Sequence, residues 1–226
     1  MPANPSAPLT GRIAADDPGV TELLAVLAYG EISAFYRLAE DAQFSPSLRG
    51  KLEMAKMAAA EMTHFETLEV ALSARGVEVF DAMAPFVRAL DAYHQSTNPS
   101  TWLESMVKAY VGDGIAADFY REIADALAPE VAETVRDVLA ETEHSEFVVA
   151  EVRSAVATSR QEKDRLTLWG RRLLGEAITQ AQFVMAQRDA LTDLVISATG
   201  DLSGIAALFD RMQQSHTQRM AMLGLV

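Results

Sequence analysis

The lengths of the connections between helical segments leave this chain few possible folds. Apolar residues recur at helix spacing through most of the 226 residues, whereas alternating strand patterns are weak. We predict one helix pair over 18–42 and 47–75, and a second over 100–127 and 129–158, each joined by a short turn. A long connection over 77–99 separates the pairs. Short turns make antiparallel neighbours, and the long connection lets the second pair cross the first. The pattern predicts an all-α four-helix bundle with one long crossover.

Helix start and stop signals set the expected boundaries. Asp16 or Asp17 precedes Pro18, a typical helix start, and Gly76 follows the second predicted helix. Ser100 or Thr101 is expected to cap the third helix. The crossover contains two prolines and is expected to carry a short helix over 87–93.

The rest of the chain divides around this bundle. Residues 1–17 are rich in Pro, Ala and Ser and are predicted to be a flexible arm before a bundle over 18–160. Residues 161–226 are predicted to form a C-terminal helical pair packed on the bundle. Its helices are expected over 163–197, with a kink near Gly170 or Gly175, and over 202–223.

Composition excludes several classes of protein. There is no cysteine, which rules out disulfides, thiolate metal sites and cysteine nucleophiles and makes a cytoplasmic location the expectation. Charged residues interrupt every apolar run, so no membrane partner is predicted. The net charge of −13 disfavours non-specific binding to nucleic acid.

Two of the four histidines follow a glutamate by three residues, at Glu61–His64 and Glu141–His144. Residues spaced by three share a helix face, so each pair can offer one oxygen and one nitrogen to a metal ion. Glu31 in the first helix and a further acid in the third also fall on apolar faces. Unpaired buried carboxylates are costly, and a shared cation offsets that cost. We therefore predict a dinuclear metal site between the four helices.

The acid of the third helix is either Asp113 or Asp118. Asp113 lies within the apolar stripe, and a glycine precedes it as one precedes Glu31, whereas Asp118 points toward the edge of the stripe. Gly112 and Gly114 flank Asp113, which favours either a local bulge or close helix packing. The predicted ligands are Glu31, Glu61, His64, Asp113, Glu141 and His144, with Asp118 as the alternative.

Other polar residues are assigned supporting or structural roles. Tyr110 lies one turn from Asp113 and is interpreted first as a core residue, with a hydrogen bond near the metals as the alternative. Asp137 lies one turn before the second Glu-x-x-His pair and is either an acceptor for the second ring nitrogen of the histidine or a solvent-facing or first-turn residue. His94 and His216 belong to no such pair and are predicted to be surface or half-buried structural residues.

The order Glu, Glu-x-x-His, acid, Glu-x-x-His resembles the ferritin-like di-iron carboxylate superfamily. Within it, the segments YGEISAFYRLAEDA and VGDGIAADFYREIAD are similar to the branch of the tRNA hydroxylase that acts on isopentenylated adenosine. The resemblance implies that Glu61 and Glu141 bridge two metal ions. Asp113 departs from it, because the superfamily usually has a glutamate there.

The resemblance implies two iron ions as cofactor, with two manganese ions or a mixed pair as the alternative. Its partners would be dioxygen or peroxide, an external electron donor, and an organic or tRNA-base substrate to be hydroxylated. Iron oxidation and handling, or peroxide disproportionation by manganese, are the alternative functions. The additional C-terminal helices predict a monomer or small homo-oligomer instead of a large cage.

Overall fold

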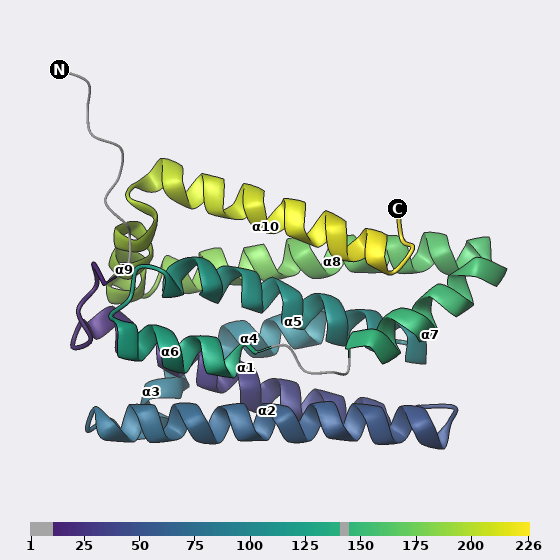
Figure 1. The fold of residues 1–226 in the computed structure, drawn as a ribbon, viewed down its shortest axis with the longest axis horizontal. Coiled ribbons are helices and arrows are strands. Elements are labelled where there is room, and N and C mark those ends of the chain that lie inside the picture. Colours follow the sequence, from purple (N-terminus) through teal and green to yellow (C-terminus); the bar gives the residue numbers. More distant parts are fainter. Residues whose placement is uncertain (1–10, 141–144) are drawn as a thin grey trace.

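The computed structural model describes residues 11–140 and 145–226, and no β-strand occurs among them. Five long helices lie side by side along the long axis of the molecule (Figure 1). They are α1 (Pro18–Ala42), α2 (Leu48–Ala74), α5 (Trp102–Ala124), α8 (Arg160–Met185) and α10 (Leu202–Met222). The predicted all-α fold is confirmed.

The long crossover joins α2 to α5 and is itself mostly helical. It contains α3 (Val79–Met83), a 3₁₀ turn η1 (Ala84–Phe86) and α4 (Val87–Ser96). Phe86 is 1 % exposed and packs in the core, so the crossover is part of the folded body. The predicted short helix over 87–93 is therefore present and extends to Ser96.

Side-chain caps explain where three of the long helices begin. The carboxylate of Asp17 accepts a hydrogen bond from the backbone N–H of Gly19 at 2.8 Å. Ser47 and Thr101 cap α2 and α5 in the same way, through the backbone N–H three residues further on. These bonds satisfy donors that the first turn of a helix leaves free.

The predicted fourth helix over 129–158 is wrong as a single element. The structure has α6 (Pro129–Val138) and α7 (Ser145–Thr158), and residues 141–144 lie outside the described part. Leu139 is the C-cap of α6, and its carbonyl accepts a hydrogen bond from Arg121 of α5 at 2.8 Å. A contact with a distant helix thus accompanies the end of α6, where the sequence contains no glycine or proline.

The predicted helix over 163–197 is also wrong, because α8 ends at Met185 and α9 (Asp189–Thr199) follows. The break lies at 186–188 and not at either glycine proposed for a kink. The carboxylate of Glu22 in α1 accepts from the backbone N–H of Leu191 at 3.0 Å and pairs with Arg188. Three helices, instead of the predicted two, therefore follow the bundle.

Residues 11–17 are held against the bundle, so the prediction of a flexible arm up to residue 17 is wrong for them. The backbone N–H of Ile13 donates to the carbonyl of Ala126, and the N–H of Ala128 donates back to Ile13, each at 2.9 Å. Ile13 is 4 % exposed and belongs to the core. Residues 1–10 lie outside the described part.

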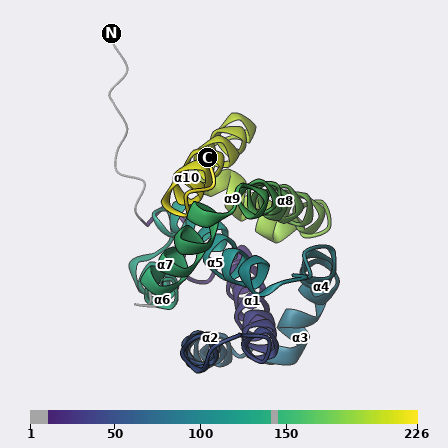
Figure 2. The same cartoon turned by 90° about the vertical axis from the view of Figure 1, so that its right-hand side faces the viewer.

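Figure 2 looks along the long helices and shows α5 near the centre of the section, with α2 at the edge beside α1. α2 packs mainly on α1, with smaller contacts to α3 and α6, whereas α8 packs on α4 and α5. Buried apolar residues form two clusters, one around α1, α9 and the crossover and one around α5, α8 and α10. A cavity lies where the two clusters meet.

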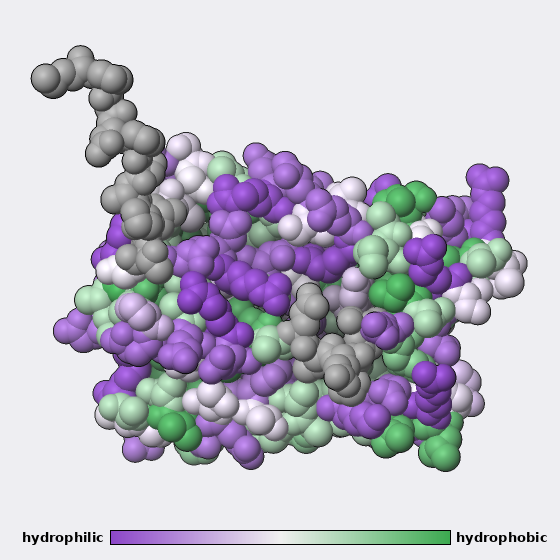
Figure 3. Space-filling view, viewed as in Figure 1, coloured by the Kyte–Doolittle hydropathy of each residue, from purple (hydrophilic) through white to green (hydrophobic). Residues whose placement is uncertain are grey.

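The surface contains no large apolar face in the view of Figure 3, where hydrophobic areas are scattered among hydrophilic residues. Within residues 11–140 and 145–226, no single helix has both the length and the apolarity needed to span a bilayer. The pair α9 and α10 passes that test only jointly, and the two helices are bent by 81°.

Candidate metal centre

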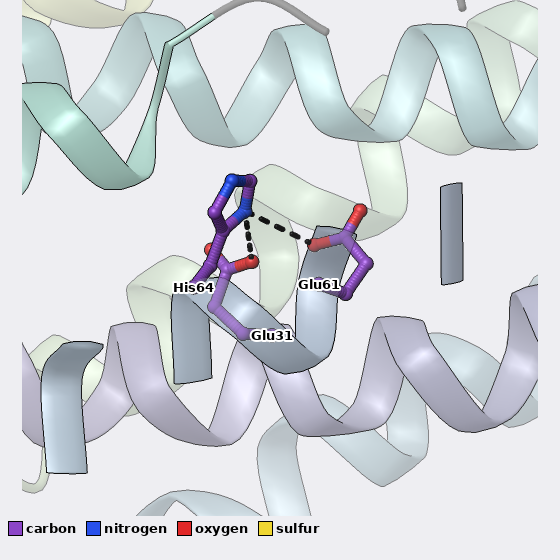
Figure 4. Close-up of side chains that lie close together, drawn as sticks. All are labelled: Glu31, Glu61 and His64. Atoms are coloured by element: carbon purple, nitrogen blue, oxygen red, sulfur yellow. Dashed lines mark hydrogen bonds and ion pairs between the residues drawn. The ribbon is translucent and has the colours of Figure 1, made fainter. Parts of the chain in front are cut away.

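Three of the predicted ligands converge between α1 and α2 (Figure 4). Nδ1 of His64 lies 3.2 Å from Oε2 of Glu31 and 3.8 Å from Oε2 of Glu61. One ligand atom from each of the three residues lies within 4.8 Å of the others. We call Glu31, Glu61 and His64 the carboxylate–histidine trio.

The trio is positioned by the seam between two antiparallel helices. Buried or partly buried residues of α2 recur at steps of four and three, at 54, 58, 61, 65, 68 and 72, and Glu61 occupies one of these positions. Glu31 occupies an equivalent position of α1 between Leu27 and Leu38, and it is 8 % exposed. His64 follows Glu61 by three residues and so shares its side of α2. Residue types that normally face water therefore occupy core positions at this level.

The ionisation of the trio shows how costly this arrangement is. Burial raises the pKa of Glu31 well above its ordinary value, the nearby Glu61 carboxyl raises it further, and the hydrogen bond from His64 opposes this. Hydrogen bonds to Glu31 and Glu61 raise the pKa of His64 to about 10, against the effect of burial. In the chain alone, a proton on His64 thus supplies the positive charge between two carboxylates. A divalent cation would supply positive charge at the same place, and carboxylate with imidazole is a donor set that suits iron or manganese.

Asp113 of α5 lies beside the trio but does not belong to it. Its side chain lines the same cavity, where water can reach it. The surrounding protein atoms raise the pKa of Asp113 to about 6, and the negative charge of Glu61 adds to the shift. Asp113 of α5 and Glu61 of α2 thus line one cavity.

Asp118 contacts α10 and not the trio. It forms an ion pair with Arg219 of α10. A Cβ atom on Gly114 would collide with the guanidinium of Arg219, so the glycine permits this close approach. α5 is a regular α-helix through 112–114. The sequence left two explanations for the flanking glycines, a local bulge or close helix packing, and close packing applies to Gly114. Asp113 is the acid of α5 that lines the cavity.

A family model described as a ferritin-like domain of actinomycetes matches residues 14–198. The chain belongs to this family. No curated protein matches the sequence. The match includes α8 and α9, which follow residue 160 or begin at it.

The second Glu-x-x-His pair of this ferritin-like domain, Glu141 and His144, lies outside the described residues. Val138 and Ala140, which precede the pair, line the cavity. The side chain of Asp137 is exposed at the end of α6, and its predicted hydrogen bond to His144 also lies outside the described part. Tyr110 is partly buried and packs against the cluster around α5.

The cavity also collects residues that the sequence analysis did not assign to a site. Arg37 and Asp41 of α1, His94 of α4 and Lys108 of α5 line its other part. They come from three helices at unrelated spacings, so no local motif could have identified them. His94 is half-buried. His216 is 4 % exposed, which makes a surface position wrong for it.

We expect Asp113→Asn to weaken binding of one of two metal ions by about tenfold or more, because it removes a charge from the ligand shell without changing its shape. Asp118→Asn should leave metal binding intact and instead reduce the free energy of unfolding by about 1–3 kcal/mol, since it breaks the ion pair with Arg219. Anaerobic ferrous titration and thermal unfolding of both variants separate the effects. Reduced iron binding in Asp118→Asn alone would contradict the assignment of Asp113.

Proposed function

We propose that this ferritin-like chain binds two iron ions between its helices and uses them to hydroxylate a small organic substrate with dioxygen. The observation that carries the proposal is the trio, in which two carboxylates and an imidazole on apolar helix faces lie within 4.8 Å of one another. Asp113 borders the same cavity. Acidic groups gathered at this density on apolar helix faces are better explained by a bound cation than by packing.

The ligand set is proposed to contain the trio and Asp113, completed by Glu141 and His144 of the second Glu-x-x-His pair. Glu61 and Glu141 are proposed as the bridging carboxylates. Four carboxylates balance the charge of two divalent ions. When bound, the iron pair would supply the reduction of dioxygen, with one oxygen atom entering a C–H bond and the other leaving as water, and with electrons and protons from an external donor.

The cavity beside the trio supports an organic substrate over iron storage. It has a volume of about 290 Å³ and is lined mainly by apolar side chains. That volume is near the lower end of the range of small-molecule sites, about 300–1,000 Å³. Iron oxidation and storage would need no apolar chamber. The walls would hold the substrate beside the trio and limit the access of water.

From the resemblance to a tRNA hydroxylase we propose the type of reaction, hydroxylation, and not the substrate. The net charge of −13 disfavours a polynucleotide partner, so we favour a small molecule over a tRNA base. Carboxylate and imidazole ligands also suit manganese, and the metal itself has to be measured.

The test is metal analysis of protein purified from its own host, followed by anaerobic ferrous titration and exposure to dioxygen with a chemical reductant. We expect about two irons per chain, oxygen uptake that depends on reductant, and a monomer or small oligomer by light scattering. A large hollow particle that accumulates many irons per chain would establish iron storage instead. Manganese content together with peroxide disproportionation would establish the third alternative.

A further inference from the structure

The part of the cavity away from the trio contains a buried cation. Lys108 is 7 % exposed, and its ammonium donates to the carbonyl of Thr97 at 2.9 Å and lies 5.5 Å from the ring centre of Tyr93. Among the residues that the structure describes, no carboxylate forms an ion pair with Lys108. A buried ammonium whose N–H donors are not all hydrogen-bonded is costly unless an anion lies close to it.

Lys108 and Arg37, in this part of the cavity, lie near two carboxylates, Asp41 and Glu40. Burial lowers the pKa of Lys108 to about 8, and Arg37 lowers it further while Asp41 opposes the shift, so the amine stays mostly protonated at neutral pH. Asp41 is the one acid of α1 that lines this part of the cavity, and burial raises its pKa to about 6. The guanidinium of Arg37 binds Glu40 at 3.2 Å. The pair of Arg37 and Glu40 is neutral, so Lys108 is the cation that this part of the cavity, here called the cationic wall, offers to a ligand.

His94 adds a neutral hydrogen-bonding group to the same wall. Its Nδ1 atom is buried and has no hydrogen-bond partner within the described chain. Burial, with the positive charges of Lys108 and Arg37, lowers the pKa of His94 to about 3, so the ring is neutral at physiological pH. A neutral imidazole can donate one N–H to an anion.

The cationic wall and the trio lie at two levels of one cavity. Lys108 precedes Asp113 by five residues on α5, which corresponds to about 7–8 Å along the helix, and Asp41 follows Glu31 by ten residues on α1, or about 15 Å. The cavity is also lined by apolar side chains from α1, α5, α8 and α10. They include Leu38, Ala109, Ile115, Phe119, Ile178 and Met212.

We propose that this cavity binds a medium-chain aliphatic carboxylate, with its carboxylate against Lys108 and His94 and its alkyl chain along the apolar wall toward the trio. The buried ammonium of Lys108 and the unpartnered ring nitrogen of His94 complement the head group, and the apolar surface complements the chain. Binding of this ligand is independent of metal. Its role as the substrate rests on the proposed function, since only a loaded trio would act on the far end of the chain.

Calorimetric titration of the full chain with octanoate and with 1-octanol tests the head-group contact, because the two probes differ mainly in charge. We expect octanoate to bind about tenfold more tightly, or better, as one desolvated charge contact allows. Lys108→Met should remove this preference and leave 1-octanol binding unchanged. The matched control is Lys56→Met, since Lys56 is exposed on α2 and pairs with Glu53.

Asp41→Asn provides a second test that keeps the buried lysine in place. It removes the negative charge that competes with the ligand, so octanoate affinity should rise several-fold while 1-octanol affinity stays the same. Equal affinities for octanoate and 1-octanol in the unaltered chain would overturn the proposal. So would octanoate affinities unchanged in both the Lys108→Met and Asp41→Asn variants.

A last comparison locates the head group. Octanoate binding should persist after chelator treatment and in Glu61→Ala, because neither removes the cationic wall. Octanoate binding that requires iron and is lost in Glu61→Ala would place the carboxylate at the trio and overturn the proposal. A chain that binds octanoate but no iron would support the carboxylate site and contradict the proposed hydroxylase function. Failure of the one proposal can therefore be distinguished from failure of the other.

Discussion

Replacing Glu61 and His64 together with alanine should lower the affinity for ferrous iron by about 100-fold or more. The double variant removes two of the three groups that meet within 4.8 Å and leaves Glu31 as the remaining member of the trio. Alanine is a strong helix former, so α2 should stay helical. Anaerobic titration with ferrous ion measures the loss, and circular dichroism checks the fold.

The matched control for this double variant is Glu66→Ala. Glu66 lies on the same helix but is exposed, so its loss should leave the iron stoichiometry unchanged. Full iron occupancy in the Glu61→Ala, His64→Ala chain would show that the trio is not the metal site. Equal losses in the double variant and in Glu66→Ala would point to a general effect of the net charge.

Iron affinity should rise about tenfold for each pH unit between pH 6 and pH 8, or about 100-fold over that range. The sign follows from His64, whose pKa of about 10 keeps it protonated throughout this range in the metal-free chain. A metal ion binds only the neutral imidazole, so binding has to release that proton. The raised pKa of Glu31 acts in the same direction and would steepen the dependence.

A pH-indicator dye measures the released protons directly during metal titration at pH 7 in weak buffer. At least one proton per trio filled is expected, after correction for the hydrolysis of the free ion. An affinity independent of pH, with no proton released, would mean that His64 does not ligate the metal.

The sequence predicts the helix starts where the cap is local and misses breaks that depend on distant contacts. Asp17, Ser47 and Thr101 cap helices through N–H groups within a few residues, and such caps leave a readable signature. The start of α9 instead depends on Glu22, 169 residues from the N–H of Leu191 that it accepts. No local pattern contains that contact, so α8 and α9 were predicted as one helix.

The candidate site likewise combines residues that a local sequence pattern predicts with contacts between residues far apart in the sequence. Glu31, Glu61 and His64 could be predicted because each falls on an apolar stripe and two of them share a helix turn. The ion pair of Asp118 with Arg219 of α10 could not be predicted, because the two residues are 101 positions apart in the sequence. The cationic wall around Lys108 could not be predicted, since it exists only where α1, α4 and α5 meet.

The place of α2 at the edge of the bundle gives metal binding a mechanical consequence. This helix supplies two members of the trio, yet it packs mainly on α1. A metal ion bound by both helices links them, and its binding free energy adds to the free energy needed to separate α2 from α1. With free ion at 100 times Kd that addition is about 2.7 kcal/mol. The empty chain would therefore loosen first along this helix, and the same loosening would admit the ion that closes it.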